Sequence, residues 1–129
     1  MNTVHHPRWG DQAKTTSAAL RRRELFDDAM AVIEREYSTR LTLGEVARRI
    51  GASTRNLQRA FAEADGTTFS RKLRAVRLER GAALLAESSL PVKTVAHAVG
   101  YRQQAEFARQ FRAFYGYPPT VYRGSRRAA

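Results

Sequence analysis

The chain of 129 residues contains no cysteine, and only 12 of its residues are acidic. Without cysteine it has no disulfide framework, no cysteine-ligated zinc site and no thiol nucleophile. No stretch approaches the length of about 18 uncharged apolar residues that a membrane-spanning helix requires. The N-terminus also lacks the apolar segment of a secretory signal. These absences predict a cytoplasmic domain with no metal or other cofactor.

Basic residues are abundant where acidic ones are scarce. The 23 Lys and Arg residues outweigh the Asp and Glu residues and give a formal net charge of +11 at pH 7. Such an excess indicates a polyanionic partner. By itself the charge leaves open whether that partner is a nucleic acid or an anionic membrane surface.

The apolar pattern divides the chain into an arm, a helical region and a tail. Residues 1–20 show no sustained period and contain Gly, Pro, Thr and Ser, which predicts a flexible N-terminal arm. The pair His5-His6 has no third ligating neighbour, so it does not indicate a metal site. From residue 21 onward apolar residues recur at three- and four-residue steps, with Ser, Thr and Gly at the expected helix ends. The pattern predicts an all-α fold of about seven helices.

The two halves of the helical region repeat each other. At an offset of 49 residues, Val46-Ala47-x-x-Ile50-Gly51 matches Val95-Ala96-x-x-Val99-Gly100. At an offset of 50 residues, Leu57-x-Arg59-x-Phe61 matches Phe107-x-Arg109-x-Phe111. Each copy consists of a short helix, a turn with glycine and a second helix with a polar face, which is the arrangement of a helix-turn-helix. The predicted parts are a first lobe at residues 21–66, a linker helix at 68–87, a second lobe at 90–123 and a basic tail at 124–129.

The second helix of a helix-turn-helix enters the major groove of DNA, and successive major grooves on one face lie about 34 Å apart. Two such helices on one chain predict an asymmetric site of about 20 base pairs, bound by a monomer. The charge and the repeat together favour double-stranded DNA over a membrane as the partner.

The polar faces of the two second helices carry the candidate base-reading residues. Arginine pairs bidentately with guanine, and glutamine pairs with adenine. The predicted base-reading residues are Arg55, Gln58 and Arg59 in the first lobe and Gln103, Gln104 and Arg109 in the second. Ser53 and Thr54, at a helix N-terminus, are expected to bind a phosphate, and Arg112 is expected to contact the DNA backbone. Glu106 either accepts a hydrogen bond from a cytosine amino group or pairs with Arg102 or Arg109 on the protein surface.

Residues 41–123 resemble the DNA-binding domain of the AraC/XylS family of bacterial transcription regulators. The matching motifs are Leu41-Thr42-Leu43…Val46-Ala47, Leu57-Gln58-Arg59-Ala60-Phe61, Arg74…Arg77-Leu78-Glu79-Arg80, Val95-Ala96…Gly100-Tyr101 and Phe107…Arg109…Phe111…Tyr115-Gly116…Pro118…Tyr122-Arg123. The resemblance implies a sequence-specific transcriptional regulator. No Ser-His-Asp set, paired carboxylates or Gly-rich phosphate loop suggests an enzyme.

Because only a short segment stands before residue 21, the chain resembles the stand-alone branch of that family. This resemblance implies a transcriptional activator that binds its promoter as a monomer, recruits RNA polymerase and associates with the nucleoid. Two alternatives remain: the excised DNA-binding domain of a longer, effector-controlled regulator, or a nonspecific architectural DNA-binding protein. The second alternative shares the charge but does not need two registered polar faces.

The chain departs from the family pattern at several positions. Arg55 stands where the stand-alone activators carry tryptophan, and Ala52 stands where many relatives have an aromatic residue. Ala105 and Ala108 replace polar residues, which predicts fewer direct base contacts by the second lobe. Gly81 replaces the usual alanine of the linker helix, at a cost of about 1 kcal/mol in helix propensity. Either it eases a close approach of the second lobe or it is an incidental replacement, and the second interpretation is favoured.

Other residues are predicted to have structural roles. The spacing of Phe61, Phe107, Phe111 and Phe114 is that of a buried helix stripe. The family motif places Arg74, Arg77 and Arg80 on the linker helix, where they are expected to form ion pairs, Arg80 with Glu79 or Glu87.

Overall fold

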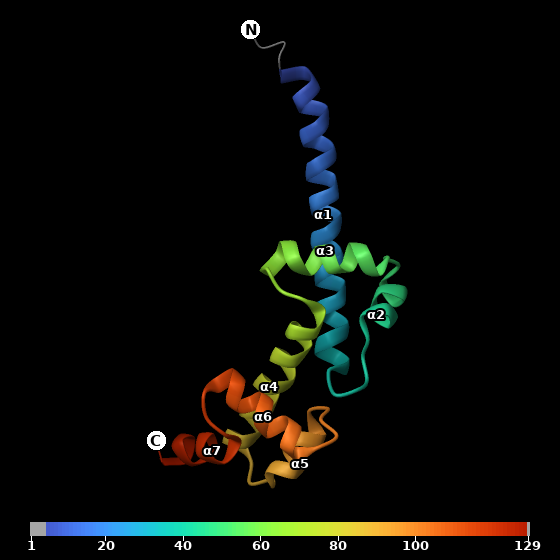
Figure 1. Cartoon of the computed structure of the whole chain (residues 1–129). Helices are drawn as coiled ribbons and strands as arrows, with labels where there is room; N and C mark the ends of the chain where they lie inside the picture. The colour runs from blue at the N-terminus through green and yellow to red at the C-terminus, as the bar shows by residue number, and fades with distance from the viewer. Residues whose placement is uncertain (1–4, 129) are drawn as a thin grey trace.

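A computed structural model describes the backbone of residues 5–128 and the side chains of residues 16–126. The described part of the chain contains no strand, and its helices are α1 (His5–Glu36), α2 (Leu43–Ile50), α3 (Thr54–Asp65), α4 (Phe69–Glu87), α5 (Val92–Ala98), α6 (Gln104–Tyr115) and α7 (Pro119–Ala128). Figure 1 shows the first lobe where α3 crosses α1, and the second lobe at the far end of α4. The predicted all-α fold, with helix-turn-helix units at α2–α3 and α5–α6, is confirmed.

Local side chains determine where the central helices begin and end. Thr42, Ser53 and Thr68 each accept a hydrogen bond from the backbone N–H three residues further on, at 3.2, 3.1 and 3.1 Å. These bonds satisfy N–H groups that have no partner inside the helix. Helix α2 ends at Gly51 with φ 76°, and α3 ends at Gly66 with φ 58°, in the left-handed region that favours glycine.

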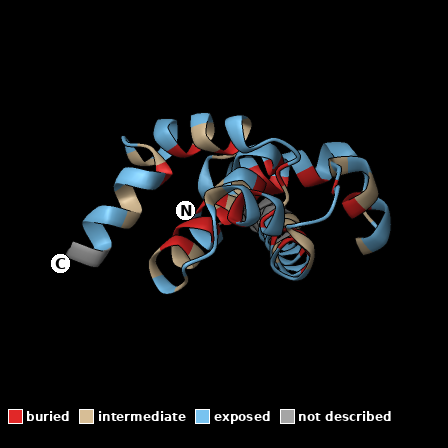
Figure 2. Ribbon diagram, turned by 90° about the horizontal axis from the view of Figure 1, so that it is seen from below, coloured by how far each residue is buried: buried red, intermediate tan, exposed pale blue. Residues whose placement is uncertain are grey.

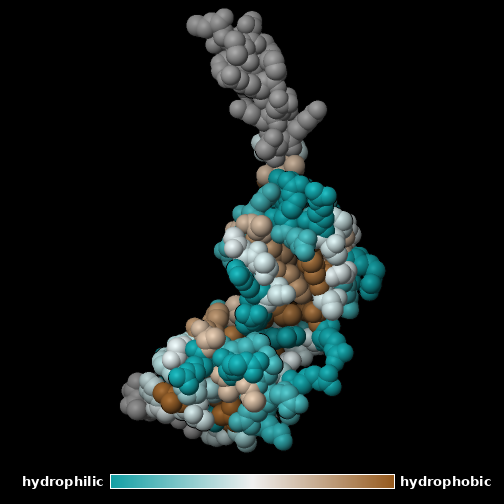
Figure 3. Space-filling model, viewed as in Figure 1, coloured by the Kyte–Doolittle hydropathy of each residue, from teal (hydrophilic) through white to brown (hydrophobic). Residues whose placement is uncertain are grey.

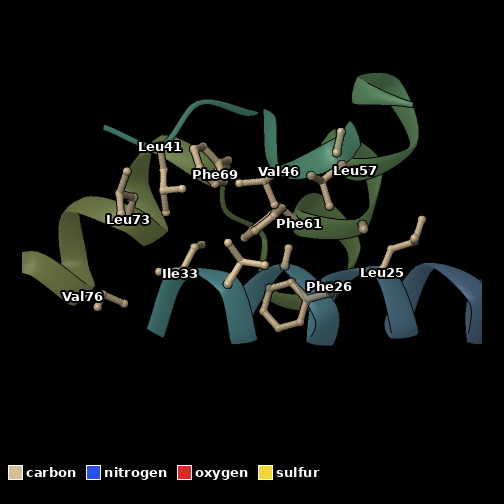
Figure 4. Close-up of a cluster of buried hydrophobic side chains, with 14 residues drawn as sticks. Leu25, Phe26, Ile33, Leu41, Val46, Leu57, Phe61, Phe69, Leu73 and Val76 are labelled. Carbon is tan, nitrogen blue, oxygen red and sulfur yellow. The ribbon is translucent and has the colours of Figure 1, made fainter. Parts of the chain in front are cut away.

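The first hydrophobic core surrounds the ring of Phe61 on α3. That ring makes edge contacts with Phe26 of α1 and Phe69 of α4, at 5.1 and 6.0 Å between ring centroids. Figure 4 shows side chains from α1, α2, α3 and α4 meeting around it. At the edge of this core Arg22 pairs with Glu63 at 2.7 Å and so ties α1 to α3.

The second hydrophobic core lies beneath α6. The buried rings of Phe107 and Phe111 have centroids 5.6 Å apart, and Tyr101 meets Phe107 edge-on at 5.4 Å. The N-terminal half of α4 belongs to the first core and its C-terminal half, from Leu78 to Leu85, belongs to the second. Figure 2 shows the buried residues on the inner sides of the helices. Helix α4 therefore carries one lobe on each half.

Phe114 is not part of the second core, contrary to the sequence-based prediction. Its side chain is 45% exposed. It lies in the last turn of α6 and makes an edge contact with Tyr115 at 4.9 Å. The apolar period continues past the point where another helix covers α6, so periodicity alone overestimates the buried stripe.

Both terminal helices are longer than predicted. Helix α1 begins at His5, so residues 5–20 are helical rather than an irregular arm, and residues 1–4 lie outside the described part. Once the packed segment after residue 25 has formed, each further residue adds a backbone hydrogen bond at little entropic cost, and Ala18, Ala19 and Leu20 are good helix formers. Likewise α7 continues to Ala128, so the predicted basic tail is helical over residues 124–128.

Gly81 is a site of close contact, so the favoured interpretation as an incidental replacement is wrong and the alternative, a close approach of the second lobe, is present. A Cβ atom on Gly81 would lie 2.8 Å from Cε1 and 2.9 Å from Cζ of Phe107. Carbon atoms that are not bonded to each other favour separations of about 3.5–4.0 Å. The missing side chain therefore lets the ring of α6 approach the backbone of α4 and determines how closely α6 packs on it.

Arg77, near the middle of α4, joins the two lobes. Its Nε atom donates to the carbonyl oxygen of Tyr37 at 2.6 Å, and its Nη2 atom donates to that of Thr39 at 2.8 Å. The turn between α5 and α6 rests on the same loop, because a Cβ on Gly100 would lie 3.0 Å from Arg77 Nε and 3.1 Å from Ser38 Cα. Arg77 thus binds backbone carbonyls of the α1–α2 loop instead of the predicted acidic partner.

The other two arginines of the linker motif also differ from the prediction. Arg80 pairs with Glu34 of α1 at 2.9 Å rather than with Glu79 or Glu87. Arg74 is exposed and has no ion pair or hydrogen bond with any described residue. Two of the three arginines therefore add polar contacts between α4 and the end of α1 with its following loop.

Replacing Gly81 by alanine tests the close contact with Phe107. Overpacking costs about 1–3 kcal/mol, which exceeds the helix-propensity gain of about 1 kcal/mol. We expect G81A to lower the free energy of unfolding, measured by urea denaturation. Gly44 of α2 is the matched control because a Cβ there meets nothing within 4 Å. G44A should be neutral or stabilising, and an equal stabilisation by G81A would contradict the proposed contact.

Replacing Arg77 by lysine tests the junction between the lobes. Lysine keeps the charge but lacks the planar fork that reaches two carbonyl groups, so about 1–3 kcal/mol of stability should be lost. The exposed Arg74 provides the control, and R74K should change the stability by less than about 0.5 kcal/mol. Thermal or urea unfolding of both variants measures the difference, and equal stabilities would show that the two bonds contribute nothing.

Candidate nucleic-acid interface

The second helix of the first unit, α3, presents one polar face to solvent. Leu57 and Phe61 are fully buried, and they hold the opposite side of α3 against α1 and α2. Arg55, Gln58 and Arg59 are all exposed, and none forms an ion pair or hydrogen bond with a described residue. Their donor groups are therefore free to meet a ligand.

The N-terminus of α3 combines Ser53 and Thr54, which are both exposed. The Oγ atom of Ser53 accepts from the N–H of Asn56 at 3.1 Å, so the hydroxyl still has its proton to donate. A phosphate contact by these two residues stays a prediction, and their position at the positive end of a helix dipole is compatible with it.

The second helix of the second unit, α6, begins with an open N-terminus. Gln103 precedes its first residue and makes no side-chain capping bond. Gln103 and Gln104 are exposed, as is Arg112 in the last turn. Glutamine amide groups thus project beside backbone N–H groups that no side chain caps.

Glu106 forms an ion pair with Arg109, which is one of the residues of the second lobe predicted to read a base. Its Oε2 atom lies 2.9 Å from Nη2 of Arg109, with 43% and 69% of the two side chains exposed. Of the two interpretations drawn from the sequence, pairing on the protein surface is therefore present, with Arg109 and not with Arg102. A contact between Glu106 and cytosine stays a prediction. The two second helices differ: the arginines of α3 are unpaired, whereas Arg109 of α6 is paired.

A series of hydrogen-bonded side chains leads from the second core to Glu106 and contains two polar residues for which the sequence predicted no role in the site. Tyr101 donates from its hydroxyl to Oε1 of Gln110 at 2.5 Å, and Nε2 of Gln110 donates to Oε2 of Glu106 at 2.8 Å. The four-residue spacing of Gln110 and Glu106 on one helix is a signal that could have been used. The role of Tyr101 depends on the folded turn and leaves no comparable local signal.

Two hollows connect the exposed faces of α3 and α6. A hollow of about 680 Å³ lies beside α4 between the lobes, with Gln103 and Glu106 of the second lobe on its border. A hollow of about 270 Å³ borders Gln58 of α3. Both hollows share the lining residues Leu43, Phe69 and Ser70. Gln58 of α3 and the Gln103–Glu106 segment therefore border hollows that meet at these three residues.

Unpaired basic side chains extend beyond the two polar faces. The following exposed residues have no side-chain ion pair or hydrogen bond within the described part of the chain: Arg35, Arg40, Arg48, Arg71, Arg74, Lys93, Arg102 and Arg126. The space-filling view in Figure 3 shows hydrophilic side chains over much of the visible surface of both lobes, with an apolar strip in the first lobe. This distribution provides a general attraction for a polyanion.

Other kinds of site find little support among the described residues. Over that part of the chain, no three His, Asp or Glu side chains are grouped closely enough to hold a metal ion. The side chains of His5 and His6 lie outside it. None of the described helices is long and apolar enough to cross a membrane.

Two helix-turn-helix units with polar second helices define a DNA-binding transcriptional regulator. The family of helix-turn-helix domains matches residues 46–125. Together with the relatives below, this match shows that the chain belongs to the AraC family of transcriptional regulators.

Similar proteins support the same family. The chain is 34% identical over 110 residues to the transcriptional activator NphR of Rhodococcus sp., covering 84% of this chain and 32% of NphR. The fold resembles the C-terminal domain of AraT, a response regulator from Geobacillus stearothermophilus, with a TM-score of 0.76, 32% identity and coverage of 79% and 85% of the two chains.

A solved complex with DNA also matches. The DNA-binding domain of AdpA, a global transcriptional factor, in complex with a target DNA, has a TM-score of 0.75 and 25% identity over 80% of this chain and 93% of that one. The chain spans only 14% to 41% of the length of the first four curated relatives that it matches.

The buried phenol of Tyr101 can be detected by its titration. Burial raises the pKa of Tyr101 above its ordinary value of 10.0, and the nearby Arg77 and Arg74 lower it in part. Burial likewise raises the pKa of Tyr115. Because the folded state favours the protonated phenols, their contribution to stability is present below pH 10 and is lost as the pH rises through the raised pKa values.

An absorbance titration of the phenolate group measures this effect. We expect the difference between the titration curves of wild type and Y101F to show one phenol that ionises above pH 10. A difference curve with its midpoint at or below pH 10 would contradict the burial of Tyr101.

Proposed function

We propose that this regulator binds one asymmetric DNA site of about 20 base pairs as a monomer, with α3 and α6 in successive major grooves. The observation that carries the proposal is that Gln58 of α3 and Gln103 and Glu106 of the second lobe border two hollows that meet beside α4. A single duplex can contact both faces only when they lie on the same side of the molecule. The AdpA domain, which has a similar fold and is in complex with a target DNA, supports DNA as the ligand.

The proposed contacts follow the chemistry of the exposed side chains. Base edges are read by Arg55, Gln58 and Arg59 in the first half-site and by Gln103, Gln104 and Arg109 in the second. Ser53, Thr54 and Arg112 contact phosphates, which position the protein without reading sequence. Glu106 accepts from a cytosine amino group in the second half-site. The remaining unpaired basic residues add affinity that depends on salt.

We further propose that the protein activates transcription by recruiting RNA polymerase at the promoter. The support is the family resemblance and the relative NphR, which is named as a transcriptional activator. Transcription in vitro from a promoter carrying the selected site tests this step, and an unchanged or lowered transcript level would contradict activation. Binding to promoters would place the protein at the nucleoid.

Selection of bound duplexes from a random pool tests sequence-specific binding. We expect one asymmetric consensus with two half-sites about one helical turn apart. Uniform binding with no consensus would instead indicate a nonspecific architectural protein. The many unpaired arginines outside the two polar faces are the feature that such a protein would share.

Alanine variants test the assignment of the base-reading residues. R59A should lose discrimination at one base pair of the first half-site, and Q104A at one of the second, each by about 1–3 kcal/mol. Arg48 of α2 is the control because it is exposed, unpaired with described residues and outside both polar faces. R48A should keep the consensus. A consensus that both R59A and Q104A leave unchanged would refute the assignment.

A further inference from the structure

We infer that Glu106 and Arg109 read the second half-site as one coupled pair, and that Tyr101 and Gln110 are positioning residues that hold this pair from the core. The inference rests on the proposed sequence-specific binding to DNA. It adds two residues to the recognition apparatus that do not belong to the predicted base-reading set.

The four residues form one line from the second core to the exposed face of α6. The hydroxyl of Tyr101 donates to Gln110 at 2.5 Å, and the amide of Gln110 donates to Oε2 of Glu106 at 2.8 Å. The guanidinium of Arg109 reaches the same oxygen at 2.9 Å. Exposure increases along the line, from 7% for Tyr101 to 69% for the side chain of Arg109.

The donor and acceptor roles along these hydrogen bonds can be assigned in only one way. An ionised carboxylate accepts hydrogen bonds and donates none, so the NH₂ group of Gln110 must face Glu106. The carbonyl oxygen of that amide then faces Tyr101, whose hydroxyl must donate. The ring of Tyr101 is held in turn by its edge contact with Phe107 at 5.4 Å. The core therefore fixes the position of the carboxylate.

On the solvent side, Glu106 and Arg109 keep an acceptor and several donors that can bind base edges. Gln110 donates to Oε2 of Glu106 and Arg109 forms its ion pair with the same oxygen, whereas Oε1 makes no hydrogen bond to a described residue. This oxygen can accept from the amino group of cytosine, while the remaining N–H groups of Arg109 donate to O6 and N7 of guanine. The held pair therefore favours a cytosine and a guanine at neighbouring positions of the second half-site.

The internal repeat shows that this line belongs to the second lobe alone. Arg59 is the counterpart of Arg109 in the first copy, and it is unpaired among the described residues. At the same offsets of 49 and 50 residues, the counterparts of Tyr101, Glu106 and Gln110 are Ala52, Asn56 and Ala60. The first copy therefore has no phenol at the first position, an amide in place of the carboxylate and no polar side chain in place of Gln110, which is why the two arginines differ in their surroundings.

The test compares two variants that break the line with one that does not. Y101F removes the hydroxyl and keeps the ring, and Q110M removes the amide and keeps a helix-forming side chain of similar length. Y115F is the matched control, because it removes a hydroxyl from the same core that makes no hydrogen bond with described residues. Each variant is used for selection from a random duplex pool and for binding to single-base variants of the wild-type consensus.

We expect Y101F and Q110M to lose about 3- to 10-fold in discrimination at the base pairs read by Glu106 and Arg109, which is the size expected for one lost hydrogen bond. The first half-site and the preferences of Y115F should stay as in the wild type. In an E106A background, Y101F should cause no further loss at those base pairs, because the line is already broken.

Three outcomes would overturn the inference. If Y101F weakens binding to all sequences equally, Tyr101 acts through stability alone. If Y101F keeps the wild-type discrimination in the second half-site, the line has no part in recognition, although the proposed function stands. If the wild-type protein selects no consensus at all, both the proposed function and this inference fail.

Discussion

The position of the second lobe on the first depends on the hydrogen bonds of one half-buried guanidinium, that of Arg77. Arg77 donates to the carbonyl oxygens of Tyr37 and Thr39 at the point where the turn at Gly100 rests on Ser38. Burial lowers the pKa of Arg77 because it penalises the charged form, while Tyr101 acts in the opposite direction. A buried cation needs compensating acceptors. The α1–α2 loop supplies them, so this contact constrains how the second lobe sits on the first.

A second constraint lies one helical turn away on α4. Residues four apart share a face of a helix, so Gly81 lies on the same side as Arg77. There the ring of Phe107 approaches the backbone more closely than any Cβ would allow. One face of α4 thus donates hydrogen bonds to the α1–α2 loop through Arg77 and packs against the ring of Phe107 at Gly81. Since α3 and α6 are each attached to their own core, the spacing between these two helices follows from neighbouring contacts on α4.

Features encoded locally were predictable from the sequence, and features that depend on distant segments were not. The starts of α2, α3 and α4 follow from Thr42, Ser53 and Thr68, and the ends of α2 and α3 follow from Gly51 and Gly66, whose capping bonds lie within a few residues. The exposed face of α3 follows from the spacing of its buried residues. By contrast, the exposure of Phe114 depends on how far other helices cover α6, and the role of Gly81 depends on a ring from the other lobe. Periodicity contains no information about either.

The difference between the two polar faces has an electrostatic consequence for the proposed complex. On α3 the charges of Arg55 and Arg59 are uncompensated by described neighbours, so this face attracts phosphate over a distance limited by the Debye length. On α6 the charge of Arg109 is offset by Glu106 at 2.9 Å. The long-range attraction of α6 therefore comes from Arg112 rather than from Arg109, and in the proposed complex the contacts of the Glu106–Arg109 pair depend on bases that supply matching groups. The net charge of +11 therefore explains affinity for DNA in general, while the compensated pair on α6 favours discrimination among sequences.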